Sequence, residues 1–190
     1  MMGSRAAHAR NLIGPLVRST YRIRVQDSAN IPARGAVLIM CDWNNIAAPS
    51  VIKAGIPRPI HVWAEGAAAL PGPLLAVTGD LAMPDQRPGV GVISQVMDLL
   101  AEGEAVAAIG VSDVGYVAAA THSPVMTVSV TAPATTRPTD PPPRKSPIVV
   151  TMGTVHTFPD RLAKRPPTRS TARAAGEWIR QLMVDEGQSR

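Results

Sequence analysis

The sequence predicts a single α/β domain in which a mixed, largely parallel sheet is flanked by helices. Short apolar runs of strand length alternate along the chain with longer segments that carry apolar residues at helical spacing. A length of 190 residues suits one domain. Apolar residues make up 45% of the chain but aromatic residues only 3%, so the core must be built from Ala, Val, Leu, Ile and Met.

Strands are expected where apolar or alternating runs end in turn residues. The expected strands are Tyr21–Gln26, Ala36–Met40, Ile60–Trp63, Ala105–Ile109, Val125–Thr131 and Ile148–Met152. Helices are expected between them, at Pro49–Ala54, Leu70–Val77, Gly89–Ala101, Gly115–Ala120 and Thr171–Val184. The segment Gly89–Ala101 has the clearest helical spacing of apolar residues, and Glu102-Gly103 ends it.

A proline-rich stretch separates the last two strands. Residues 132–147 hold six prolines in sixteen residues, which excludes a regular element. We expect a mobile or polyproline II connection there. A plain insertion is the favoured interpretation, and a partner-binding role for Pro141–Lys145 is the alternative.

Polar residues follow the apolar run of the second expected strand: Asp42, Trp43, Asn44 and Asn45. Pro49 then opens the next helix, a position that suits proline. In α/β proteins ligands bind beyond the carboxyl ends of the strands, so we expect the functional site here.

This frame resembles the first motif block of the glycerophospholipid acyltransferases, the family of lysophosphatidic acid acyltransferase. There the strand ends in N-H-x-S-x-x-D-P. Pro49 matches the family proline, but Trp43 stands at the His position and Ala48 at the Asp position. The resemblance extends over about Tyr21–Met183 and implies a glycerol-3-phosphate acyltransferase-like fold.

The two replacements remove the family's proton transfer. In the family, the His takes the proton of the acceptor hydroxyl, and the Asp holds the imidazole in the right tautomer. An indole nitrogen only donates, so Trp43 cannot accept that proton, and Ala48 has no polar atom. No histidine of the chain has an acidic residue five positions later, so the pair has not been displaced.

The other motif blocks are altered as well. Asp85 stands where the family Arg contacts phosphate, with Arg87 two residues later, and a carboxylate there would repel a phosphate. Gly110–Asp113 replaces the family's F-P-E-G, and Thr127 replaces the second proline of P-V-x-P-V. We therefore expect no catalytic residues, and Trp43 either plugs the vacated pocket, which we favour, or lines an acyl-chain groove.

The resemblance implies a set of binding positions: Trp43, Asn44, Asn45, Asp80, Asp85, Arg87, Ser112 and Asp113. It implies a catalytically degenerate homologue that binds an acyl chain or glycerolipid, or regulates an active lipid enzyme, in phospholipid or cell-envelope lipid metabolism. The first alternative is an active acyltransferase that uses acyl-CoA or acyl carrier protein with a replaced base; the candidates are Asp42, Asn45, Asp80, Asp113 and His61. The second alternative is a basic interaction protein that works through its ends and its proline-rich insertion.

Charge and cysteine content set further limits. The net charge is +5: residues 1–24 and 137–190 each carry +5, whereas residues 25–136 carry −5. The basic ends suit an anionic membrane surface, but the chain has no nucleic-acid-binding motif. The single Cys41 and the lack of a long apolar run favour a cytoplasmic protein, peripheral at most on the inner face of the membrane. No metal or cofactor is expected, because the four histidines are scattered.

The expected organisation is a basic helical segment over residues 1–20 and an acyltransferase-like domain over residues 21–190. The proline-rich insertion belongs to the second part.

Overall fold

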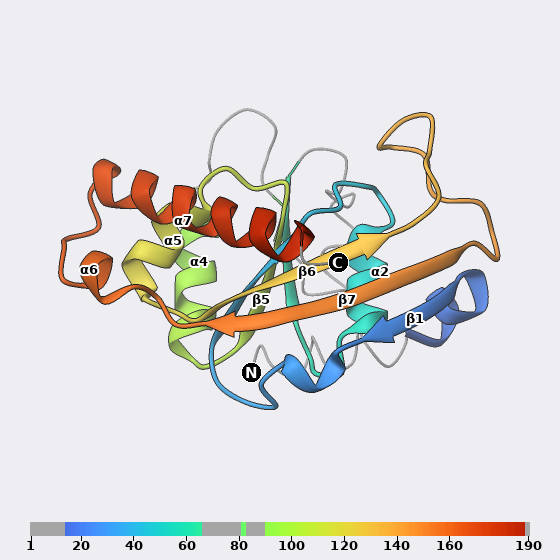
Figure 1. Ribbon diagram of the computed structural model, residues 1–190, viewed down its shortest axis with the longest axis horizontal. Coiled ribbons are helices and arrows are strands. Elements are labelled where there is room, and N and C mark those ends of the chain that lie inside the picture. The colour runs from blue at the N-terminus through green and yellow to red at the C-terminus, as the bar shows by residue number, and fades with distance from the viewer. Residues whose placement is uncertain (1–13, 66–80, 83–89, 189–190) are drawn as a thin grey trace.

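A computed structural model describes residues 14–65, 81–82 and 90–188. Seven strands form one sheet in the order β1-β7-β6-β2-β5-β3-β4 (Figure 1). Their bounds are β1 Arg22–Gln26, β2 Val37–Cys41, β3 His61–Ala64, β4 Leu81–Ala82, β5 Ala105–Ile109, β6 Val125–Thr131 and β7 Pro147–His156.

The sheet is mixed but mostly parallel. β6, β2, β5, β3 and β4 run in one direction, and β7 and β1 run in the other, because β7 pairs antiparallel with β6. β2 is buried along its whole length, which is typical of a central parallel strand covered on both faces. β1 alternates between exposed and half-buried residues, as an edge strand does. The predicted fold class is therefore confirmed.

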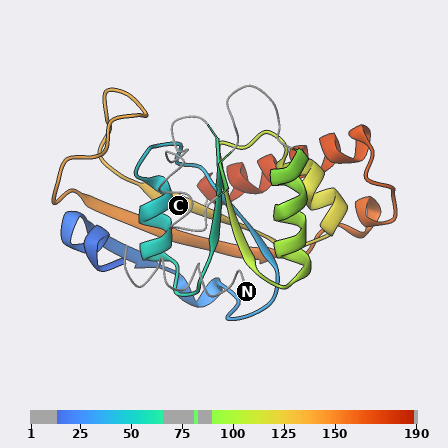
Figure 2. The same cartoon turned by 180° about the vertical axis from the view of Figure 1, so that it is seen from behind.

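Helices cover both faces of the sheet, and each face has its own apolar core. On one face, Ile39 of β2 packs with Val51 and Ile52 of α2, Ala48–Gly55. We call this cluster the α2-side core. On the other, Leu38 and Met40 pack with residues of α4 Val90–Ala101, α5 Val114–Thr121 and α7 Arg169–Gln188. Figure 2 shows α2 and α4 on opposite sides of β3 and β5.

The expected elements recur with small shifts at their ends. β5 and β6 have the bounds that the sequence predicts, whereas β7 extends beyond Met152 to His156. β4, the short helix α6 Asp160–Ala163 and the 3-10 turn Ser28–Asn30 were not predicted. The expected helix Leu70–Val77 lies outside the described residues.

The described end of the N-terminal segment packs on the body of the protein. Residues 14–20 are helical, Val17 is buried in the α2-side core, and the Arg18 guanidinium donates to the carbonyl of Ala54 at 2.6 Å. Leu16 on the same turn is 67% exposed. Whether the segment contacts a membrane stays a prediction.

α5 and α7 cross at backbone contact because a glycine of each helix lies at the crossing. A Cβ built on Gly115 would lie 2.3 Å from the carbonyl oxygen of Ala172 and 2.7 Å from the amide nitrogen of Gly176. Only hydrogen fits there, so the absence of a side chain at Gly115 permits this distance between the helices. A Cβ on Gly176 would instead meet nothing nearer than 3.9 Å.

Gly115→Ala is expected to destabilise the fold by about 1 to 3 kcal/mol, since two backbone segments must separate to admit the methyl group. Gly176→Ala is the matched control, and we expect it to be neutral or stabilising by up to about 1 kcal/mol through its helix propensity. Urea unfolding of both variants measures the difference. Equal stabilities would contradict the close crossing.

Candidate functional site

The motif residues lie together at one edge of the sheet. Because β2, β3 and β5 run parallel, the loops after Cys41, Ala64 and Ile109 leave from the same edge. We call the loop residues 42–45, 65 and 110–113 the motif edge. The parallel sheet thus brings together the first and third motif blocks that the sequence singled out.

Trp43 and Ala48 both belong to the α2-side core. Ala48 is fully buried in the first turn of α2, and Trp43 is half-buried against the same apolar cluster. The amide of Trp43 points back to the Cys41 sulfur at 3.4 Å. At the two positions where the family carries an imidazole and a carboxylate, this chain therefore places apolar groups in van der Waals contact with its core. The choice between plug and groove lining for Trp43 stays a prediction.

Asn45 holds the loop and the proline-rich connection together. Its side-chain oxygen accepts from the amide of Ala47 at 2.9 Å, and its nitrogen donates to the carbonyl of Asp140 at 3.0 Å. The amide of Ile46 also donates to the carbonyl of Pro138 at 3.1 Å. Asn45 is 2% exposed, and its side chain has a structural role in this loop. Its expected binding role stays a prediction.

These contacts attach the proline-rich stretch of residues 132–147 to the body of the protein. The stretch has no regular element before β7 begins at Pro147, as predicted. It is nevertheless attached at its middle through Asn45 and Ile46, and at its end through the amide of Lys145, which donates to Thr20 at 2.7 Å. Proline removes a backbone donor but keeps its carbonyl, and the amide of Ile46 donates to that of Pro138.

The third motif block packs against the first through a glycine. Gly110 has φ +66°, and a Cβ there would lie 3.1 Å from the side-chain nitrogen of Asn44 and 3.4 Å from the carbonyl of Glu65. Glu65 in turn accepts a hydrogen bond from the amide of Ser112 at 3.2 Å. The carboxylate of Glu65 thus accepts a hydrogen bond from a backbone amide of the loop that stands in place of the family's F-P-E-G block.

The motif edge is acidic. The Asp42 side chain is exposed and accepts from the amide of Val130 at 3.1 Å, which extends the β2–β6 pairing by one bond. Asp113 is half-buried at the start of α5, where its side chain makes no capping hydrogen bond. Together with Glu65, three carboxylates lie on the loops of this edge. Asp80, Asp85 and Arg87 lie outside the described residues.

The described histidines lie at the opposite edge of the sheet. His61 is the first residue of β3, His122 ends α5 just before β6, and His156 pairs with Val125, the first residue of β6. At about 3.3 Å per residue, a four-residue strand places His61 about 10 Å from the motif edge. His61 is therefore not brought to the site where it was considered as a replacement base, and Asp42 and Asp113 are.

Cys41 is not a nucleophile at this site. Its side chain is 4% exposed, and burial raises the pKa of the thiol to about 12. The thiolate form is absent at neutral pH, as expected for a buried Cys that packs as a small apolar residue.

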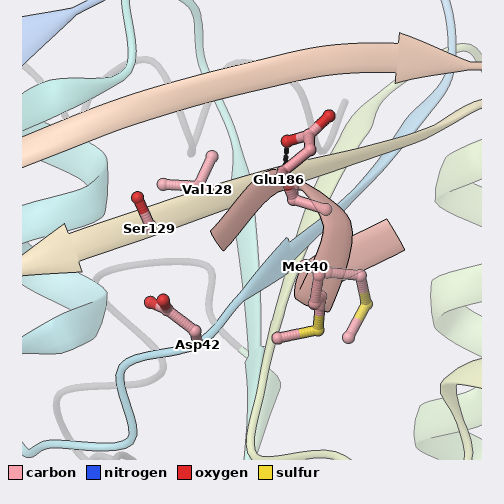
Figure 3. A pocket seen from close by; sticks show the side chains of 7 residues that line it. Met40, Asp42, Val128, Ser129 and Glu186 are labelled. Atoms are coloured by element: carbon pink, nitrogen blue, oxygen red, sulfur yellow. Dashed lines mark hydrogen bonds between the residues drawn. The ribbon is translucent and has the colours of Figure 1, made fainter. Parts of the chain in front are cut away.

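A pocket missed by sequence reasoning adjoins the motif edge on the α7 face (Figure 3). It encloses about 240 Å³, including its open mouth. Its lining residues are Met40, Asp42, Thr127, Val128, Ser129, Met183 and Glu186. Asp42 belongs to both the pocket and the motif edge, so the two form one continuous region.

Glu186 of α7 hydrogen-bonds to β6 and β7 near the place where their pairing is irregular. The pairing shifts register between Met126 and Val128. Glu186 accepts from the amide of Thr154 at 3.0 Å, from its hydroxyl at 2.8 Å and from the Thr127 hydroxyl. His156 lies 3.0 Å from the same carboxylate. A β-bulge disrupts the ladder locally, and here a carboxylate from α7 takes the amide of Thr154.

The contacts of Glu186 decide its protonation. Burial alone would raise the pKa of the Glu186 carboxyl, but hydrogen bonds from Thr127, His156 and Thr154 outweigh that effect and lower it. Gly153 leaves the space that this carboxylate occupies, because a Cβ there would overlap Glu186 and Thr127. In sequence the one signal was Thr127 at a family proline position. Nothing local links it to Glu186, 59 positions later, or links Glu186 to Thr154.

The described residues hold no group of three or more His, Cys, Asp or Glu side chains arranged to bind a metal ion. None of their helices is long and apolar enough to cross a bilayer.

A solved structure shares the fold of this chain. The crystal structure of the 1-acyl-sn-glycerophosphate (LPA) acyltransferase PlsC from Thermotoga maritima superimposes with a TM-score of 0.56 at 14% sequence identity, over 100% of this chain and 80% of that one. No protein-family model and no curated protein matches the chain. The fold is therefore that of an LPA acyltransferase, as the motif frame predicts.

Asn45→Asp is expected to destabilise the fold by about 1 to 3 kcal/mol, because it replaces a donor by a carboxylate facing the carbonyl of Asp140. The exposed neighbour gives the control: Asn44→Asp should change stability by less than about 1 kcal/mol. Urea unfolding tests the stability, and trypsin tests the connection. Faster cleavage after Arg144 and Lys145 in Asn45→Asp alone is expected, and equal cleavage would contradict the anchoring role.

Glu186→Gln is expected to cost about 1 to 3 kcal/mol, because an amide cannot accept all the hydrogen bonds that the carboxylate takes. The pKa of Glu186 is lower in the folded protein than in the unfolded chain. The ionised carboxylate therefore stabilises the fold fully above the ordinary glutamate pKa, and this stabilisation is lost as pH falls through the folded-state pKa. Wild type should therefore lose more stability in acid than Glu186→Gln. Asp185→Asn, one residue earlier on α7 and exposed, should keep both the stability and the acid dependence of wild type.

Proposed function

We propose that this chain is a non-catalytic homologue of the LPA acyltransferases that binds an acyl chain or an uncharged glycerolipid at the motif edge. Ala48 and Trp43 carry the proposal. Both pack into the α2-side core at the positions of the family's acid and base. Without a proton acceptor beside the acceptor hydroxyl, the thioester cannot be attacked at an enzymatic rate.

The rest of the motif edge offers no substitute imidazole. All three histidines among the described residues lie at the far edge of the sheet, near the starts of β3 and β6. The carboxylates of Asp42 and Glu65 accept backbone hydrogen bonds from Val130 and Ser112. Both carboxylates are therefore already engaged by the backbone of neighbouring loops.

The charge of the motif edge argues against a phosphate-bearing acceptor. Asp42, Glu65 and Asp113 are all acidic, and the sequence places Asp85 where the family has its phosphate-binding Arg. A phosphate brought to this edge would meet carboxylates of the same sign. An uncharged glycerolipid meets no such repulsion and can place its acyl chain on apolar groups such as the Trp43 indole. In this proposal the protein acts as a lipid-binding or regulatory partner of an active lipid enzyme.

The test is an acyl-transfer assay with acyl-CoA and lysophosphatidic acid, with the Thermotoga maritima PlsC enzyme as the positive control. We expect no turnover above the rate without protein. Trp43→His combined with Ala48→Asp should also be inactive, because the phosphate contacts are missing. Turnover by wild type at the rate of the positive control would refute the proposal and favour an acyltransferase that uses Asp42 or Asp113.

The binding half of the proposal needs its own measurement. We expect wild type to bind a monoacylglycerol in calorimetric titration and Trp43→Ala to bind it at least several-fold more weakly, since the indole supplies much of the apolar contact. Leu16→Ala is the control, because it removes an exposed apolar side chain that belongs neither to the motif edge nor to its pocket. Binding that is absent from wild type, or equal in Trp43→Ala, would reject a lipid site here.

A further inference from the structure

A groove runs between α6 and α7, at the end of the molecule away from the proline-rich connection (Figure 1). It encloses about 640 Å³, including its open mouth. The residues that line it are Arg161, Leu162, Arg165, Ala174, Glu177 and Trp178. We refer to it as the α6–α7 groove, and none of its residues belongs to the motif edge.

Two arginines face this groove from a fixed backbone. Leu162 is 5% exposed and anchors α6 in the core, while Arg161 and Arg165 on either side of it are exposed. The turn that follows is tied to α7, because the Thr171 hydroxyl donates to the carbonyl of Pro166 at 2.9 Å. The backbone that carries both guanidinium groups is therefore held before any ligand arrives.

The opposite wall is an indole held by other rings. Trp178 meets Phe158 edge-to-face, with ring centroids 5.6 Å apart and an angle of 86°. Phe158 is stacked on His122 at 5.3 Å. Trp178 is half-buried, so one part of it packs in the core and another lines the groove. The groove thus pairs a cationic wall with a fixed aromatic wall.

In the part of the chain that the structure describes, the two arginines of the groove, Arg161 and Arg165, form no ion pair. The one acidic lining residue, Glu177, already pairs with Arg173 at 3.2 Å. Residues 160–180 carry six basic and two acidic side chains, a net charge of +4, and all eight are exposed. The field around the groove therefore attracts anions.

We propose that the α6–α7 groove binds a phosphate group, either of a small phosphorylated ligand or of a lipid headgroup. Guanidinium groups present a planar fork of donors that matches phosphate oxygens in bidentate pairs. Arg161 and Arg165 supply two such forks on one wall, and the Trp178 indole contacts the less polar part of the ligand. The proposal uses no residue of the motif edge and does not depend on the function proposed above.

The test compares two charge-matched double variants. Arg161→Gln/Arg165→Gln removes the groove cations, and Arg169→Gln/Arg180→Gln removes two exposed cations that do not line the groove. Calorimetry with inorganic phosphate measures the small-ligand source. Co-sedimentation with phosphatidylcholine vesicles, with and without phosphatidic acid, measures the lipid source. Thermal unfolding of each variant checks that the fold is kept.

We expect wild type to bind at least one of the two phosphate probes. The groove variant should bind that probe at least about tenfold more weakly, as the loss of charged hydrogen bonds implies, and the control variant less than about threefold more weakly. Binding to phosphatidic acid vesicles alone identifies the lipid source, and binding to inorganic phosphate identifies the small ligand. No binding to either probe, or equal losses in the two variants, overturns the proposal.

Discussion

The structure depends on the burial of β2. Its five apolar residues pair with β5 on one side and β6 on the other, and both faces are covered by helices. The backbone N–H and C=O groups of a fully buried strand must form hydrogen bonds with neighbouring strands. Parallel neighbours in turn require crossover connections, usually helices, that pass over the faces of the sheet. That requirement places α2 on one face and α4 and α5 on the other. It also directs the motif loops to one edge.

That edge carries the loops of two motif blocks, and backbone contacts hold them in place. The parallel strands still deliver two motif blocks to the same place, where Gly110 packs closely on Asn44. The side chains of Asp42, Asn45 and Glu65 each accept a hydrogen bond from a backbone amide. Backbone contacts therefore maintain the loop conformation. Two arginines that form no ion pair among the described residues, Arg161 and Arg165, line the groove between α6 and α7.

Most of the fold was predictable because its elements are local patterns. β5 and β6 are short apolar runs between clear turns, and their bounds agree with the prediction. The two-residue β4 and the four-residue α6 are too short for any period to show. The attachment of the proline-rich connection was not predictable, since the side-chain amide that holds it, that of Asn45, lies about 90 residues away in sequence.

The sequence by itself determined the order of the elements, the presence of Trp43 and Ala48 in the loop and helix after β2, and the uneven charge of the chain. These properties follow from composition and spacing and do not depend on the folded structure. Only the tertiary structure decided which distant groups meet: Glu186 with Thr154 at the bulge, and Trp178 opposite two free arginines. Such contacts depend on helix crossing and strand register, and a register shift of one residue would turn each side chain to the other face.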